Sequence, residues 1–503
     1  MCAHGIILAF VPVVPEKWSS VREKLNSIPN RFVFALYVAL VLLGGALLFN
    51  SFIGYRAGAW SASSMAAPAA LLAVALALFV RLALQWRSLP ERIFLVTATP
   101  ALVGFALFIL PDHIPDEVWH IYRIFSIEDP GSHMVVPSPL LQSALPTDYT
   151  ELYAALTGAY SWSDTMVVGR DMSSYLTHLY LVPGIVVKLC MLANVNPFVT
   201  IYVARLVNAT LFAVGGYWII KTMPLARVCM CVYLLNPMLI QQEASCSADA
   251  VTNIITLLFI AYLMRVRFQD AVTRRDIVVL VVLFVVTALS KYAYALLVFL
   301  FLLLVPKIER KRTRTAIYAG TAVVFAAGLL FVVFFASSAS YQTTLDLIRN
   351  PPELAAVLAK TFYEVGPVWV MQFAGFSLSN LDVSPWWPCF WAYGTVLLFS
   401  LVFNLGEKIA LKRPEKVGVI ALVVFASIAI ILVFRGWTLD VDKRSDVILG
   451  VQGRYFLPFY NLILLCLSTP QASLVRKNCL LIYSTVIACI YAIDLVTLAR
   501  FFA

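Results

Sequence analysis

The sequence predicts an all-α, polytopic integral membrane protein. Of its 503 residues, 61% are hydrophobic and only 13% are charged, whereas a soluble chain carries about a quarter charged residues. Apolar runs of about 20 residues recur along the whole chain, and each is long enough to cross a hydrocarbon core of about 30 Å. Alternating runs of about 10 residues, which are typical of membrane-spanning strands, do not occur. The spans are therefore expected to be helices.

The positive charge is distributed as in membrane proteins. The net charge is +10, but Lys and Arg occur in short clusters between apolar runs, such as KIERKRTR (307–314) and EKIALKRPEK (407–416). Such clusters are typical of cytoplasmic loops. A nucleic-acid-binding chain would show a continuous basic face instead. Membrane lipids are therefore expected partners, and nucleic acid is not.

The basic clusters predict how the chain threads the membrane. We expect a cytoplasmic N-terminal segment (1–31), a transmembrane domain (32–503) of about thirteen helices, and an external C-terminus. The expected spans are 32–50, 65–85, 92–111, 198–220, 228–243, 247–264, 276–306 (crossing twice), 314–337, 386–406, 417–435, 455–469 and 478–497.

Two apolar segments need special treatment in this threading. If the run at 175–195 crossed the membrane, the basic loop at 265–275 would lie outside, so we expect a juxtamembrane helix there. The run at 276–306 lies between two basic loops and is too short for two full spans. It is expected to form two short helices that meet at Ser290 and Lys291.

The polar segments gather on the external side of this threading. They are a loop at 112–197 and shorter loops at 338–385 and 436–455. Residues 112–174 carry nine acidic residues against two arginines, which agrees with an external position. Any chemistry is therefore expected at the external face.

The densest set of ionisable groups is PDEVWHIYR (115–123). A helix starting at Pro115 would carry Asp116 and Glu117 in its first turn. Asp116, His120 and Arg123 would then share one face. A carboxylate beside an imidazole and a guanidinium suits proton abstraction from a hydroxyl next to a bound phosphate. A capped helix with a solvated charged face is the structural alternative.

Two cations lie at the expected outer ends of spans. Arg454 follows Gln452 and precedes Tyr455 in GVQGRYFLP, and Lys291 interrupts a 31-residue apolar stretch. Ionisable groups at membrane depth are costly and usually functional, although a snorkelling arginine is a common alternative. For Asp249 in SCSADA, capping of the following helix is the simpler interpretation.

The sequence gives no sign of a tightly bound metal or cofactor. It contains no HxxxH and no clustered His/Cys set. The nucleotide-binding patterns GxxxxGK[ST] and GxGxxG after a strand are also missing. No tightly bound cofactor is expected, and a weakly held divalent cation stays open.

Four blocks of the sequence stand out together: PDEVWHIYR, NPMLIQQEASCSADA, ALSKYAY and GVQGRYFLPFY. They resemble a bacterial membrane family of formerly unknown function that is grouped with the C-type (GT-C) glycosyltransferases, and the resemblance spans about 92–470. It implies a multi-pass enzyme of the bacterial inner membrane with a periplasmic active site. Such an enzyme would transfer a sugar from a polyprenyl-phosphate donor to a glycan or lipid-linked glycan such as O-antigen, with inversion.

The resemblance also implies residue roles. Asp116 would be the general base, and Glu117 would orient the acceptor or share that role. The donor phosphate would be bound by Lys291 and Arg454, with Arg123 assisting. Supporting positions would be His120, Gln452, Tyr455 and Asp249.

Two other functions are compatible with the same residues. A transporter or flippase of lipid-linked sugars could use Lys291 and Arg454 to hold a phosphate, although no half-to-half repeat is evident. A non-catalytic scaffold for glycan assembly would need none of the acidic residues.

Overall fold

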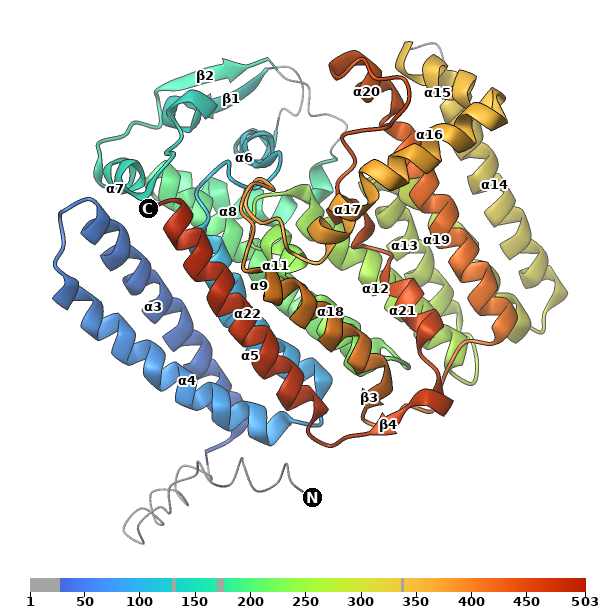
Figure 1. The fold of residues 1–503 in the computed structure, drawn as a ribbon, viewed down its shortest axis with the longest axis horizontal. Helices are drawn as coiled ribbons and strands as arrows, with labels where there is room; N and C mark the ends of the chain where they lie inside the picture. Colours follow the sequence, from blue (N-terminus) through green and yellow to red (C-terminus); the bar gives the residue numbers. More distant parts are fainter. Residues whose placement is uncertain (1–27, 129–132, 170–175, 336–338) are drawn as a thin grey trace, which may run out of the picture.

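The computed structural model describes residues 28–128, 133–169, 176–335 and 339–503. It is mostly helical, and its long helices run side by side between two ends of the molecule (Figure 1). Most of the predicted N-terminal segment 1–31 lies outside the described residues.

Seven described helices are long and apolar enough to cross a membrane, or eight if one bent pair is a single span. The expectation of about thirteen spans is therefore wrong. The seven are α3 (Asn30–Arg56), α4 with the turn before it (Ala62–Trp86), α5 (Pro90–Phe108), α9 (Pro197–Thr222), α12 (Ala248–Phe268), α19 with α20 (Arg413–Val441) and α22 (Cys479–Phe501). The bent pair is α16 (Pro351–Glu364) with α17 (Gly366–Phe373), at 50°.

Several apolar runs are too short or too broken to cross. The run at 228–243 divides into α10 (Arg227–Leu234) and α11 (Pro237–Glu243), because Asn236 ends one helix and caps the next by accepting from the Met238 and Leu239 amides. At 1.5 Å per residue, an eight-residue helix is only about 12 Å long. The run at 228–243 is apolar because its side chains fill the protein core.

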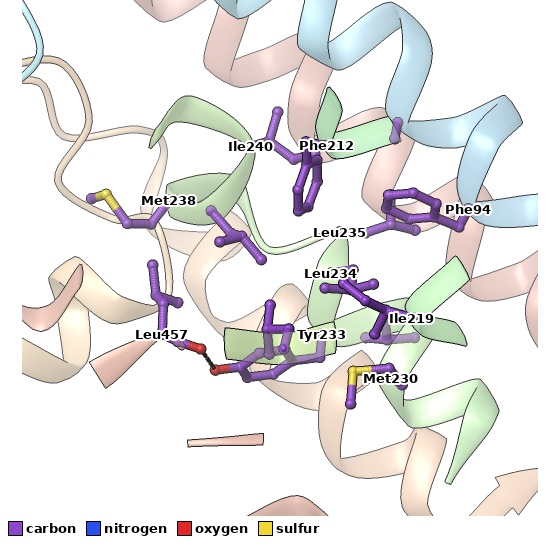
Figure 2. Packing of buried hydrophobic residues seen from close by; sticks show 14 of the residues in the cluster. Phe94, Phe212, Ile219, Met230, Tyr233, Leu234, Leu235, Met238, Ile240 and Leu457 are labelled. Atoms are coloured by element: carbon purple, nitrogen blue, oxygen red, sulfur yellow. Dashed lines mark hydrogen bonds between the residues drawn. The ribbon is translucent and has the colours of Figure 1, made fainter. Parts of the chain in front are cut away.

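The core confirms that position for α10 and α11. Figure 2 shows Leu234 of α10 in one buried cluster with Phe94 of α5 and Phe212 of α9, and Tyr233 of α10 beside Leu457. The Tyr233 hydroxyl donates to the carbonyl of Leu457, 2.6 Å away. A hydrophobic run was therefore mistaken for a span because burial in protein and burial in lipid select the same residues.

Two other predicted spans are also short helices. They are α18 (Trp387–Val402) and α21 (Asn461–Leu467), which follows the 3₁₀ turn η7 (Gly453–Phe456). The run expected to lie at the interface forms α8 (Leu181–Leu192), whose 12 residues cover only about 18 Å.

The expected break at Ser290 and Lys291 is confirmed. Helix α13 (Arg274–Ser290) ends there, Lys291 is extended, and the 3₁₀ helix η6 (Tyr292–Lys307) follows. A 3₁₀ helix rises about 2.0 Å per residue, so the 16 residues of η6 reach about 32 Å. Helix α14 (Lys311–Phe335) comes next.

The segments that connect the long helices form two groups, one at each end of the molecule. At one end, Arg227 pairs with Glu91 and Arg267 pairs with Glu415. These contacts join the basic segments expected in the cytoplasm. The short strands β3 (Phe403–Asn404) and β4 (Leu474–Val475) pair in parallel at the same end (Figure 1).

The other end holds the segments expected to be external. They are more structured than loops, and the C-terminus joins them through the Phe502 carbonyl, which accepts from the Tyr149 amide. Their elements are α6 (Glu117–Phe125), the antiparallel strands β1 (Met134–Pro137) and β2 (Thr165–Val168), η3 (Ser138–Leu140), η4 (Gln142–Ala144), α7 (Tyr149–Thr157), η5 (Thr177–Leu179), α15 (Ala339–Arg349), α16, α17 and α20 (Arg435–Val441). The class is therefore mostly helical with two small sheets.

Candidate functional site

The PDEVWHIYR segment forms a shorter helix than expected. Helix α6 begins at Glu117, and Asp116 is its N-terminal flanking residue in a left-handed conformation, with φ of 65°. Its side chain makes no capping bond. Asp116 therefore does not share a helical face with His120 and Arg123, because it turns out of the helix before the first turn begins.

The two adjacent carboxylates point to different partners. Glu117 is fully buried and faces Arg205 of α9, whose Nε donates to Glu117 Oε1 at 2.8 Å and whose Nη2 reaches Oε2. The Cys246 amide also donates to Glu117 Oε1, at 3.0 Å. Glu117 is thus a buried anchor between α6, α9 and the turn before α12.

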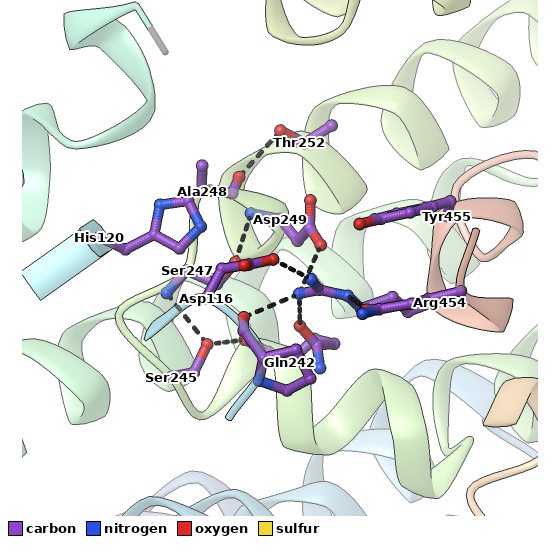
Figure 3. Close-up of polar contacts among 12 residues, drawn as sticks. Asp116, His120, Gln242, Ser245, Ser247, Ala248, Asp249, Thr252, Arg454 and Tyr455 are labelled. Atoms are coloured by element: carbon purple, nitrogen blue, oxygen red, sulfur yellow. Dashed lines mark hydrogen bonds and ion pairs between the residues drawn. The ribbon is translucent and has the colours of Figure 1, made fainter. Parts of the chain in front are cut away.

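Asp116 faces Arg454 instead (Figure 3). Arg454 Nη2 lies 2.7 Å from Asp116 Oδ2, and the arginine side chain is 2% exposed whereas Asp116 is 50% exposed. The same guanidinium donates to Gln242, Gln452 and the Pro115 carbonyl. Arg454 is therefore held rigidly, and Asp116 is the accessible end of the pair.

Asp249 connects this pair to the second cation. Its Oδ1 accepts from Lys291 Nζ at 2.9 Å, and its Oδ2 lies 3.3 Å from Arg454 Nη1. The expectation that Asp249 caps α12 is wrong, because Ser247 is the cap and accepts from the Asp249 amide. Asp249 is thereby free of the helix end and can bridge Lys291 and Arg454.

Tyr455 lies against both cations of this cluster. Its ring centroid is 4.4 Å from Lys291 Nζ and 5.2 Å from the guanidinium carbon of Arg454. The electron-rich face of an aromatic ring attracts cations at such distances. The four charged groups, Asp116, Asp249, Lys291 and Arg454, form what we call the charge cluster.

His120 borders the charge cluster in an uncharged state. Its Nδ1 is 2.7 Å from the Tyr180 hydroxyl. Burial lowers the pKa of His120 to about 4, although the nearby Asp249 and Asp116 favour the charged form. The imidazole is therefore neutral near pH 7.

Arg123 holds the external segment together. It is fully buried, it donates to the Ser126 and Ile127 carbonyls and to the Thr177 hydroxyl, and it stacks on Tyr180. These contacts tie the end of α6 to the segment before α8. They give Arg123 a structural role in the loop.

The structure adds residues that were not singled out from the sequence. Gln242, in QQEASCSAD, accepts from Arg454 Nη1 at 3.1 Å. Arg205 is a lone arginine within an apolar run, and that pattern by itself indicates a buried partner. The sequence around Arg205 does not indicate that its partner is Glu117, which lies 88 positions away.

No group of three His, Cys, Asp or Glu side chains that could hold a metal ion occurs among the described residues. Both carboxylates of the charge cluster already contact cations. The cluster is thus electrically balanced, with two acidic and two basic side chains.

These features define a multi-pass integral membrane protein with a polar cluster at the start of α12 and the end of α13. The chain belongs to the family described as "Predicted membrane protein (DUF2142)", whose model matches residues 128–463. The match confirms the membrane family of unknown function expected from the sequence blocks, and it includes Lys291 and Arg454 but begins after Asp116. No curated protein and no solved structure matches the chain.

Proposed function

We propose that this protein is a membrane-embedded glycosyltransferase of the GT-C type. It transfers a sugar from a polyprenyl-phosphate donor to a glycan or lipid-linked glycan at the external face. The observation that carries the proposal is the half-exposed Asp116 carboxylate beside Arg454, which Asp249 links to Lys291. A base next to an anion-binding pair is what glycosyl transfer from a phosphate requires.

The reaction follows from these positions. Asp116 accepts the proton of the acceptor hydroxyl, whose oxygen attacks the anomeric carbon of the donor sugar. The bond from that carbon to the phosphate oxygen breaks, and the leaving polyprenyl phosphate takes the electron pair. Lys291 and Arg454 stabilise the charge that develops on the phosphate. Attack opposite the leaving group inverts the anomeric centre.

Donor binding competes with contacts already present in the charge cluster. Arg454 faces both Asp116 and Asp249, so an entering phosphate exchanges one anionic partner for another. Asp249 keeps Lys291 and Arg454 together while this exchange takes place. Asp116, released from Arg454, then faces the acceptor hydroxyl when donor and acceptor are both bound.

The remaining predicted residues take supporting roles in this proposal. Glu117 and Arg123 anchor α6 and are not part of the chemistry, because each is buried among its own partners. His120, Gln452 and Tyr455 border the charge cluster and position its members. The arrangement is consistent with GT-C enzymes in outline, with short helices beside the first acidic segment.

The decisive test is Asp116→Asn in nanodiscs, supplied with polyprenyl-phosphate sugars and a cell-envelope glycan extract. Loss of a general base lowers the transfer rate by about 10²–10⁴-fold. Asp346→Asn is the matched control, because Asp346 is an exposed helical aspartate paired with Arg349. Full transfer by Asp116→Asn, at normal protein levels, would show that the base is assigned wrongly.

A transporter or flippase is the second candidate, and one observation favours it. Asp494 in α22 is 1% exposed, and its carboxyl oxygens have no hydrogen-bond partner among the described residues. Buried intramembrane carboxyls often serve proton relays in transporters. Flux of labelled lipid-linked sugar across liposomes that is lost in Asp494→Asn, with no new glycosidic bond, would favour transport over transfer.

A further inference from the structure

An open cleft lies beside α6 on the external segment. It has a volume of about 470 Å³ and is lined by Trp119, Tyr122, Leu141, Gln142, Ser143 and Val168. This volume lies within the range of about 300–1,000 Å³ that is usual for small-ligand sites. The charge cluster does not contribute to the lining, so the cleft is a separate feature.

The walls of the cleft are fixed by hydrogen bonds. The Gln142 amide donates to the Tyr122 hydroxyl at 2.6 Å, and the Gln142 side chain donates to Asp112 Oδ2 at 3.0 Å. Asp112 Oδ1 in turn accepts from the Val118 amide of α6. The wall formed by η4 is thus tied to α6 at two points, and the cleft is preformed.

The lining combines aromatic surface with uncharged polar groups. The rings of Trp119 and Tyr122 lie edge to face, with centroids 5.6 Å apart. Gln142 and Ser143 add an amide and a hydroxyl, and the six lining side chains that belong to the described residues carry no charge. A pyranose ring has apolar C–H faces and several hydroxyl groups, so it matches this surface. A phosphate would meet no cation among these described lining residues.

The cleft is also close to the proposed base. Trp119 follows Asp116 by three positions, and its amide donates to the Asp116 carbonyl at 3.1 Å. The Asp116 side chain turns to Arg454. The start of α6 therefore joins Asp116, which contacts Arg454, to Trp119, which lines the cleft.

We infer that this cleft binds neutral sugar units of the acceptor glycan and delivers its terminal hydroxyl toward Asp116. The inference rests on the proposed transferase function and names the chemistry of its acceptor. The donor phosphate is held at Lys291 and Arg454, and the neutral acceptor chain is held at Trp119 and Tyr122. The anionic donor and the neutral acceptor therefore bind at two different sites near the N-terminal end of α6.

The test measures the two sites independently on the full chain in nanodiscs. Fluorescently labelled neutral trisaccharides of glucose, galactose, mannose and N-acetylglucosamine are titrated by fluorescence polarisation without donor. We expect at least one trisaccharide to bind, Trp119→Ala to weaken binding by about tenfold, and Trp119→Phe to retain most of it. Trp391→Ala, at an exposed tryptophan of α18, is the matched control and should bind as the wild type does.

A second titration with a polyprenyl-phosphate sugar separates this inference from the proposed function. If Trp119→Ala binds the trisaccharide like the wild type, or if the wild type binds none, the cleft assignment is overturned while donor binding still supports a transferase. If the wild type binds the trisaccharide but not the donor, the proposed function fails and the cleft remains a glycan site without that reaction.

Discussion

Glu117 and Arg205 form a two-point ion pair that is fully buried between α6 and α9, and it stands next to the half-exposed Asp116. Two neighbouring carboxylates thus have opposite surroundings. Glu117 is enclosed with its counter-ion Arg205. The same arginine also donates to the backbone carbonyls of Ala106, Ile109 and Leu110. The other, Asp116, is half exposed.

This difference predicts that Glu117→Gln acts on stability. Breaking a buried ion pair from one side leaves an uncompensated charge on Arg205 and costs about 3–5 kcal/mol. We expect a lower yield and a lower melting temperature, measured by thermal unfolding in nanodiscs. Glu128→Gln is the control, since Glu128 is largely exposed in its pair with Lys188 and should change little. A Glu117→Gln protein that melts normally but is inactive would return Glu117 to the chemistry.

Arg454→Lys is predicted to fail despite keeping the charge. Arg454 uses three nitrogens to contact Gln452, Gln242 and Asp116, and a lysine ammonium cannot reproduce that planar fork. We expect donor affinity to fall by about tenfold or more, measured by titration of a polyprenyl-phosphate sugar. Arg444→Lys, at an exposed arginine between Glu364 and Asp446, should bind donor normally. Unchanged affinity in Arg454→Lys would mean that only charge matters at this position.

His120 predicts a pH dependence of stability. Its pKa is about 4 in the folded protein and near 6.5 when unfolded, so the unfolded chain binds more protons between these values. Stability therefore falls as the pH drops below about 6.5, and the loss from this group is complete near pH 4. Over this pH range, the lowered pKa of His120 reduces the free energy of unfolding by about 3 kcal/mol in total.

The measurement compares melting temperatures of the wild type and His120→Gln from pH 7 to pH 4. The variant should lose less stability on acidification. Burial also lowers the pKa of His178, but that residue is present in both proteins, so the difference isolates His120. Parallel curves for the two proteins would contradict a buried neutral imidazole.

The position of Ser247 as the cap of α12 predicts that its removal slightly lowers stability and also disturbs the position of Asp249. Ser247 accepts from the Asp249 amide, and replacing such a cap by alanine costs about 1 kcal/mol. We expect Ser247→Ala to lower the melting temperature slightly and to weaken donor binding, because Asp249 would no longer hold Lys291 and Arg454 in register. Ser247→Asp, which restores the cap, should recover the melting temperature. If Ser247→Ala binds donor like the wild type, the orientation of Asp249 does not depend on its cap.

Sequence reasoning located some local features well. The break at Ser290 and Lys291 was predictable because a charged residue within an apolar stretch flanked by basic loops requires the chain to turn there. Prediction from the sequence failed where one local pattern can have two physical causes, burial in lipid and burial in protein. The apolar run at 228–243 was interpreted as a span, but Asn236 and Pro237 divide it into two short buried helices.

By itself, the sequence determined the class of the protein, a helical multi-pass membrane protein, because hydropathy and the placement of basic residues depend only on composition along the chain. Only the tertiary structure decided which carboxylate faces which arginine. Asp116 meets Arg454 across 338 positions, and Glu117 meets Arg205 across 88. Helical periodicity assigns a side chain to a face, but the partner on that face is chosen by how distant helices pack. A left-handed residue at the start of α6 was enough to send two neighbouring carboxylates to different partners.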